Sequence, residues 1–134
     1  MSVVVDSSVF SLYLRRDRTL DDPYLTTFLD LFDKDQIILL GVVYQELLSG
    51  IRFDPQFDRL SKIMQGFPLV LATQEDHLLA ARYFNNCRAH GIQGASFDYL
   101  ICAMAVRCNY PILTLDDDFT HYAQHIPIQL YRSV

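Results

Sequence analysis

The chain has 134 residues, of which 51% are hydrophobic and 20% charged, and this predicts a single globular domain over residues 1–134 rather than a disordered chain. Taken alone, its formal net charge of −5 argues against a protein that coats nucleic acid through a basic face. No apolar run approaches the length of a membrane span, and Asp6 ends the first apolar run too early for a signal peptide, so we expect a cytoplasmic protein.

The first half of the chain alternates short apolar runs with helical patterns. Ser2–Val5 is typical of a strand buried on both faces of a parallel sheet. Either Ser7 or Ser8 can cap the helix predicted over Val9–Arg15, and a helix cap is also one interpretation of Asp6. Further patterns predict a helix over 21–32, a strand over 37–40 ended by Gly41, helices over 42–49 and 54–65, a strand over 69–71, and a helix running to His90 after a capping box of Thr73 and Asp76.

The second half is dominated by the stretch Ala95–Phe119. Asp98 begins a predicted helix, and a turn at Asn109-Tyr110-Pro111 separates this helix from a strand over 112–115. Three consecutive aspartates, Asp116–Asp118, follow the strand, and a helical turn over 119–124 and an edge strand over 127–131 complete the chain. Such an alternation of strands and helices predicts an α/β fold with a parallel β-sheet flanked by helices.

Acidic residues recur where this fold brings strand ends and helix starts together. Asp6 follows the first strand, Glu46 lies on the helix after the second, Asp98 starts a helix, and Asp116–Asp118 follow the fourth strand. Two carboxylates about 4 Å apart repel each other by about 4 kcal/mol at an effective dielectric of about 20, so such a cluster indicates a bound cation. Oxygen ligands favour Mg²⁺ or Mn²⁺, which assist cleavage of phosphodiesters.

Four segments in order, VVVDSSVF, GVVYQELLSG, FDYLICAMAV and ILTLDDDF, resemble the motifs of the PIN-domain ribonucleases, particularly the VapC-type toxins of toxin–antitoxin pairs. The resemblance covers residues 3–119 and implies a PIN-like α/β/α sandwich that forms a single nuclease domain. It further implies a catalytic, metal-binding acidic quartet of Asp6, Glu46, Asp98 and Asp116, with Asp118 as a further metal ligand beside Asp6, Asp98 and Asp116. A hydroxyl after the first aspartate is also similar, which implies that Ser8 supports the site.

The resemblance also implies partners and a reaction. It implies Mg²⁺- or Mn²⁺-dependent hydrolysis of an RNA substrate, a homodimer, and a cognate antitoxin protein. Arg15, Arg16 and Arg18 follow the first catalytic turn closely enough to help bind RNA, although a solvated loop is the alternative interpretation. The competing hypothesis is a non-catalytic PIN-like module that binds protein or RNA. Loss of a quartet carboxylate would favour that hypothesis, and none is missing.

The first two predicted helices carry more large apolar side chains than one helix face can bury. These residues are Phe10, Leu12, Tyr13, Leu14, Leu25, Phe28, Leu29 and Phe32. We expect an antitoxin segment or a second copy to cover the excess.

The roles of the three adjacent aspartates depend on the backbone there. In an extended chain, Asp116 and Asp118 would point to the same side and Asp117 away from it, whereas a turn beginning at Asp116 would break this alternation. The extended interpretation makes Asp116 the metal ligand and leaves Asp118 to orient water or cap a turn.

The three cysteines are odd in number and lack C-x-x-C spacing, so we expect no zinc site. Cys87 and Cys102 lie in apolar helical segments, which predicts buried free thiols.

Overall fold

The computed structural model describes residues 1–15 and 21–132, so the predictions made for Arg16 and Arg18 lie outside the described residues. Within these ranges the chain forms a parallel sheet in the order β3-β2-β1-β4. Its strands are β1 (Val3–Val5), β2 (Ile37–Leu40), β3 (Leu69–Val70) and β4 (Ile112–Leu113). The strands β1 and β2 are buried along their whole length, as expected for strands covered on both faces.

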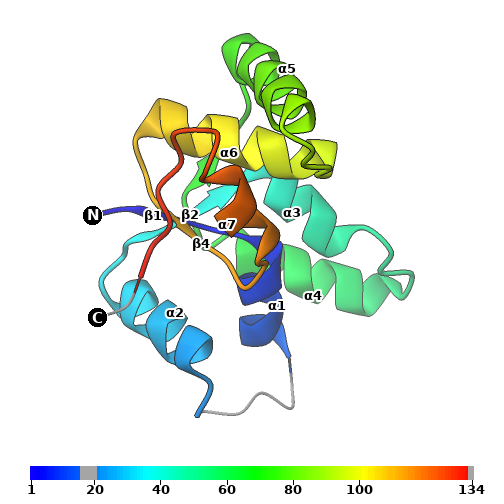
Figure 1. The fold of residues 1–134 in the computed structure, drawn as a ribbon. Coiled ribbons are helices and arrows are strands. Elements are labelled where there is room, and N and C mark those ends of the chain that lie inside the picture. The colour runs from blue at the N-terminus through cyan, green and yellow to red at the C-terminus, as the bar shows by residue number, and fades with distance from the viewer. Residues whose placement is uncertain (16–20, 133–134) are drawn as a thin grey trace.

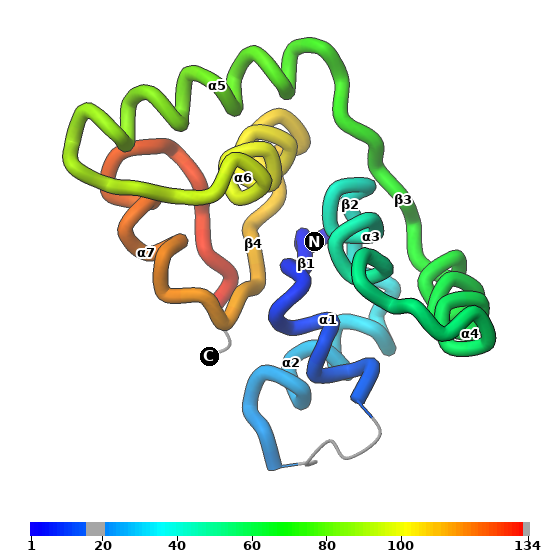
Figure 2. The backbone as a smooth tube through the Cα atoms, turned by 90° about the vertical axis from the view of Figure 1, so that its right-hand side faces the viewer, coloured from blue at the N-terminus to red at the C-terminus, as the bar shows by residue number. Residues whose placement is uncertain are grey.

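Helices cover both faces of this sheet. They are α1 (Ser7–Leu14), α2 (Pro23–Asp33), α3 (Gly41–Leu48), α4 (Asp54–Met64), α5 (Gln74–Ala89), α6 (Ser96–Cys108) and α7 (Asp118–Tyr122). Helices α5 and α6 lie on one side of the sheet, and α1 and α2 lie on the other (Figure 1). In Figure 2 the strands β1, β2 and β4 lie between α5 and α6 above and α1 and α2 below. The α/β/α arrangement predicted from the sequence is therefore confirmed.

Side-chain caps explain where several helices begin. The Asp6 carboxylate caps α1 by accepting a hydrogen bond of 2.7 Å from the Ser7 N–H, so the predicted serine cap is wrong and the cap interpretation of Asp6 is confirmed. The capping box at the start of α5 is confirmed, since Thr73 and Asp76 exchange both of its hydrogen bonds.

Several predicted boundaries differ from the observed ones. Gly41 was expected to separate the second strand from the next helix, but it is the first residue of α3. Helix α6 begins at Ser96, so Asp98 is its third residue rather than its first. The fourth strand ends at Leu113, two residues earlier than predicted. The predicted edge strand over 127–131 contributes one parallel bridge, Ile112 with Leu130, beside β4.

The apolar side chains of α1 and α2 mostly pack against each other, so the predicted exposed excess on these helices is wrong. The rings of Phe10, Phe28 and Phe67 contact one another edge to face, and Tyr13 stacks on Phe28 with ring centroids 4.6 Å apart. Of the large apolar residues expected to be exposed there, only Phe32 is.

Two further predictions concerned the burial of the cysteines and the absence of a membrane span. Cys87 and Cys102 are buried free thiols, as predicted. Among the described residues, none of the helices combines the length and the apolar character that crossing a membrane requires.

Candidate metal centre

Five carboxylates lie around the carboxyl ends of β1 and β4. Asp6 directly follows β1, and Asp116 lies between β4 and α7. Glu46 belongs to α3, Asp98 to the first turn of α6, and Asp118 is the first residue of α7. The parallel topology places these segments at one edge of the sheet, because carboxyl ends of parallel strands meet there.

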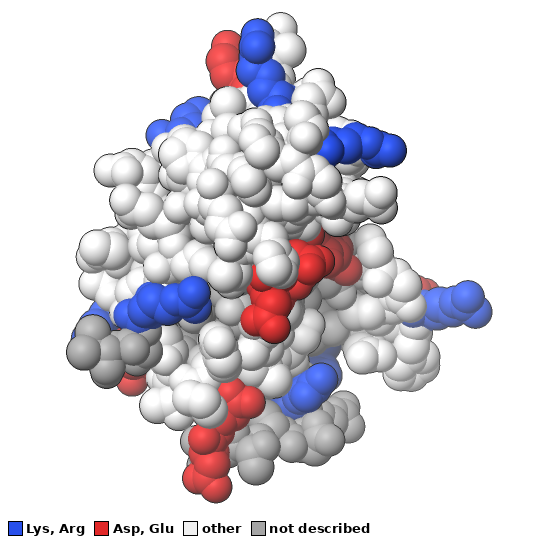
Figure 3. Space-filling view, in the orientation of Figure 1, with Lys and Arg blue, Asp and Glu red and all other residues white. Residues whose placement is uncertain are grey.

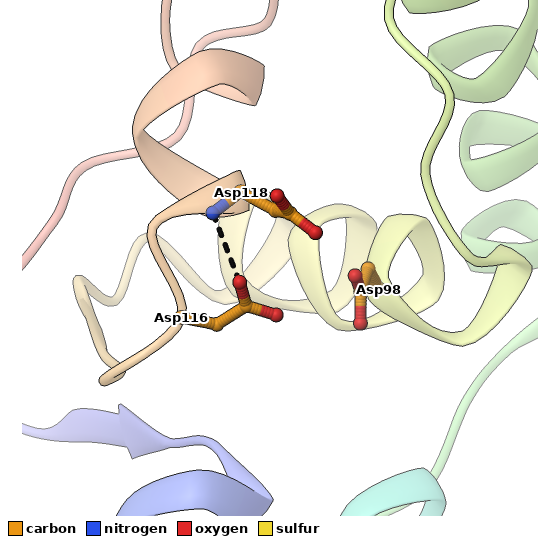
Figure 4. Close-up of side chains that lie close together, drawn as sticks. All are labelled: Asp98, Asp116 and Asp118. Carbon is orange, nitrogen blue, oxygen red and sulfur yellow. Dashed lines mark hydrogen bonds between the residues drawn. The ribbon is translucent and has the colours of Figure 1, made fainter.

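Three of these carboxylates form a compact cluster. One oxygen each of Asp98, Asp116 and Asp118 lies within 4.8 Å of the other two. The side chains of Asp116 and Asp118 point toward Asp98 from the opposite side of the cluster (Figure 4). One group of acidic side chains also lies near the middle of one face of the molecule (Figure 3). An oxygen-only cluster of this kind suits a hard divalent cation.

A turn, not an extended chain, brings Asp116 and Asp118 together. Asp117 has helical backbone angles of φ −63° and ψ −19°, so the predicted alternation through this segment is wrong. The backbone N–H of Asp118 donates a hydrogen bond of 2.9 Å to Oδ1 of Asp116. The two side chains thus share one site because the Asp116 carboxylate accepts a hydrogen bond from the first N–H of α7. Aspartates just before a helix commonly make such a bond.

Hydroxyl groups hold the carboxylate of Asp6, which is 5% exposed. Its Oδ2 accepts hydrogen bonds from Ser8 Oγ at 3.0 Å and from Thr114 Oγ1 at 2.8 Å. The Ser8 and Thr114 hydroxyls in turn accept the backbone N–H groups of Leu115 and Asp116, each at 3.0 Å. Asp6 is therefore fastened to the loop that carries Asp116.

A third hydroxyl, that of Ser7, lies between Asp6 and Glu46. Ser7 lies beside the Asp6 carboxylate, and its Oγ donates a hydrogen bond of 3.0 Å to Oε1 of the exposed Glu46. Neither Asp6 nor Glu46 belongs to the compact cluster of three aspartates. Sequence reasoning missed Ser7, Thr114 and Tyr122 as partners of these acids, and only Thr114 has a sequence signal, a polar residue closing an apolar strand.

Asp98 experiences the combined charge of this site. The pKa of Asp98 is raised to about 6 by burial, which is the largest cause, and by the nearby carboxylates of Asp6, Asp116 and Glu46, while a hydrogen bond from Tyr122 lowers it. Among the described residues, the ion pairs are Lys34 with Asp30 and Arg107 with Asp76, so no described lysine or arginine pairs with the site carboxylates. Uncompensated negative charge of this kind fits a bound cation.

The parallel sheet and the acidic cluster at the carboxyl ends of its strands describe an α/β protein with a candidate metal site. The family model of the PIN domain matches residues 3–124, and the chain belongs to this family. None of the curated proteins matches the sequence as a relative.

Solved structures with the same fold are similar in length to this chain. FitAcB from Neisseria gonorrhoeae has a TM-score of 0.77 and 17% identity, with 97% of this chain and 96% of that chain covered. VapBC-5 from Mycobacterium tuberculosis, a member of the VapBC family of toxin–antitoxin systems, has a TM-score of 0.69 and 20% identity, with 98% of each chain covered. VapC20 from the same organism, described as a sarcin–ricin loop cleaving toxin, has a TM-score of 0.67 and 13% identity over 95% of this chain and 98% of that chain.

Proposed function

We propose that the protein is a Mg²⁺- or Mn²⁺-dependent ribonuclease and the toxin of a toxin–antitoxin pair, with residues 1–134 forming one nuclease domain. The observation that carries the proposal is the compact cluster of Asp98, Asp116 and Asp118, whose charge no described cation balances. Membership of the PIN family and the fold shared with VapC20 and VapBC-5 support the same function.

Each carboxylate has a distinct place in this proposal. Asp98, Asp116 and Asp118 hold the cation, and Asp6 serves as a further ligand that Ser8 and Thr114 keep in place. When bound, a divalent ion lowers the pKa of water and offsets negative charge on a phosphodiester. Glu46 is exposed and accepts a hydrogen bond from Ser7 and from no other described residue, so its carboxylate remains able to take a proton from the attacking water.

The partners follow from the same family context. We propose a cognate antitoxin because several proteins with this fold are toxin–antitoxin complexes, and we propose a homodimer that acts on cytoplasmic RNA. Large apolar side chains remain exposed away from α1 and α2, among them Phe53 and Leu71. An antitoxin segment or a second copy would remove such side chains from water.

An RNA cleavage assay tests this proposal. The chain is expressed with the neighbouring open reading frame, freed of any partner, and incubated with RNA in Mg²⁺, in Mn²⁺ and in excess EDTA. We expect cleavage with either ion and none in EDTA. Cleavage that persists in EDTA would contradict the metal mechanism. RNA binding without cleavage under all conditions would favour the non-catalytic module instead.

A further inference from the structure

Tyr122 links Asp98 to the helix that carries Asp118. It is the last residue of α7, the helix that begins at Asp118, and its side chain is fully buried. Its hydroxyl donates a hydrogen bond of 2.9 Å to Oδ2 of Asp98 in the first turn of α6. This single bond therefore ties the helix that carries Asp98 to the helix that carries Asp118.

Packing leaves the Tyr122 hydroxyl little freedom to move. The ring contacts those of Tyr99 and Phe119, with centroids 4.8 Å and 5.3 Å away. Gly94 lies directly against the hydroxyl end: a Cβ atom there would come within 2.7 Å of the Tyr99 hydroxyl and closer still to that of Tyr122. Only glycine leaves room for both hydroxyls at this position.

The hydrogen bond occupies one oxygen of Asp98 and leaves the other available. No described residue donates to Oδ1 of Asp98. In this bond the Tyr122 hydroxyl is the donor, because an ionised carboxylate oxygen can only accept. Tyr122 is consequently a fixed donor and not a base.

We propose that Tyr122 is a positioning residue for the metal centre, which holds the Asp98 carboxylate at a fixed place facing Asp116 and Asp118. The inference rests on the proposed function, because it assigns Tyr122 to the same cation site. Without the bond, repulsion between the carboxylates would turn Asp98 away from the cluster. Mutation of a residue that orients a metal ligand in this way commonly weakens metal binding about 10- to 100-fold.

Direct measurement of Mn²⁺ binding tests the inference without relying on activity. We compare the parent, Tyr122→Phe and the matched control Tyr99→Phe by isothermal titration calorimetry at pH 8. Tyr99 is an adjacent buried tyrosine whose hydroxyl has no hydrogen-bond partner among the described residues. We expect Tyr122→Phe to bind Mn²⁺ about tenfold more weakly and Tyr99→Phe to bind as the parent does. Saturating Mn²⁺ should restore most RNA cleavage by Tyr122→Phe.

A second variant acts on the same bond from the backbone side. Gly94→Ala should press on the Tyr122 hydroxyl and weaken Mn²⁺ binding in the same direction. Parental Mn²⁺ affinity in Tyr122→Phe would overturn the inference, as would an equal loss in Tyr99→Phe, which would indicate a general packing effect. A parent that binds no Mn²⁺ would instead overturn the proposed function, and the inference with it.

Discussion

The carboxyl group of Asp98 lies where burial and neighbouring carboxylates all disfavour its charged form. Its pKa is about 6 in the folded protein against an ordinary value of 3.8. Between these values the folded protein binds more protons than the unfolded chain, so the free energy of unfolding falls as the pH rises through this window. Above about pH 6 the full destabilisation by the Asp98 charge is present.

Asp98→Asn should therefore stabilise the metal-free protein at neutral and higher pH. In EDTA at pH 8 we expect its free energy of unfolding to exceed that of the parent by on the order of 1–2 kcal/mol, a modest value because the site is partly solvated. Below pH 4 the difference should vanish, since Asp98 is then protonated in the parent. Urea unfolding at both pH values measures this, and a less stable variant at pH 8 would identify Asp98 as a structural residue of α6.

The turn at Asp117 predicts different roles for the three adjacent aspartates. Asp116→Asn keeps an oxygen for the Asp118 N–H but removes a charge from the cluster, so it should lower RNA cleavage on the order of 100-fold. Asp118→Asn should raise the Mn²⁺ concentration needed for cleavage. The exposed Asp117, which lies outside the cluster, provides the control, and Asp117→Asn should cleave at the parental rate. Equal damage from Asp116→Asn and Asp117→Asn would contradict these roles.

Residue patterns located the acids better than their hydrogen-bond partners. Asp6 and Asp116–Asp118 followed predicted strands, Asp98 started a predicted helix, and Glu46 lay on the helix after the second strand, all of which a sequence shows directly. Thr114 donates to Asp6 across 108 positions of the chain, and Tyr122 donates to Asp98 across 24. Local patterns do not encode such tertiary contacts.

At the level of elements, most boundaries were predictable because caps and apolar periods mark them. The capping box at Thr73 fixed the start of α5. The start of α6 was misplaced because Ala95 precedes it and no side chain caps it. The end of β4 was misplaced because Thr114 is β-branched and Leu115 is apolar, as strand residues often are. In the structure the Thr114 hydroxyl donates a hydrogen bond to Asp6, and the backbone N–H of Leu115 donates one to Ser8.

One ion pair that links α5 to α6 joins the buried carboxylate of Asp76 to the exposed side chain of Arg107. Arg107 Nε donates a hydrogen bond of 2.7 Å to Asp76, whose side chain is 1% exposed. Burial raises the pKa of Asp76, but hydrogen bonds from Arg107 and Thr73 outweigh burial and lower the pKa below its usual value. The stabilisation is therefore present at neutral pH and is lost as the pH falls.

Arg107→Met should lower the free energy of unfolding by about 2 kcal/mol, because it leaves the Asp76 carboxylate buried without its charged partner. The matched control is Lys34→Met, which breaks the exposed pair with Asp30 and should cost less than about 1 kcal/mol. Chemical denaturation at pH 7 provides the measurement. Equal effects of the two substitutions would show that burial of Asp76 does not strengthen its ion pair.

On the scale of the whole molecule, the proposed RNA substrate is a polyanion that would have to bind a protein with a net charge of −5. A groove of about 330 Å³ between α1, α3 and α4 is lined by Arg15 and Arg59. It also contains Ser11 and Leu47. Ser11 lies one helical turn beyond Ser7 in α1, and Leu47 follows Glu46 in α3, so the groove begins beside the acidic site. Neither arginine forms an ion pair with a described residue.

Replacing these two arginines should therefore weaken RNA binding and reduce its salt dependence. We expect Arg15→Ala and Arg59→Ala each to lower the slope of log affinity against log salt by about 0.7, the value for one lost phosphate contact with single-stranded nucleic acid. Binding is measured by fluorescence anisotropy in the Asp116→Asn background with Mg²⁺, so that the RNA stays intact. Arg88→Ala is the control, because Arg88 lies on α5 over the ring of Phe84. If Arg88→Ala changes the slope as much as Arg59→Ala does, RNA binds through diffuse charge and not through this groove.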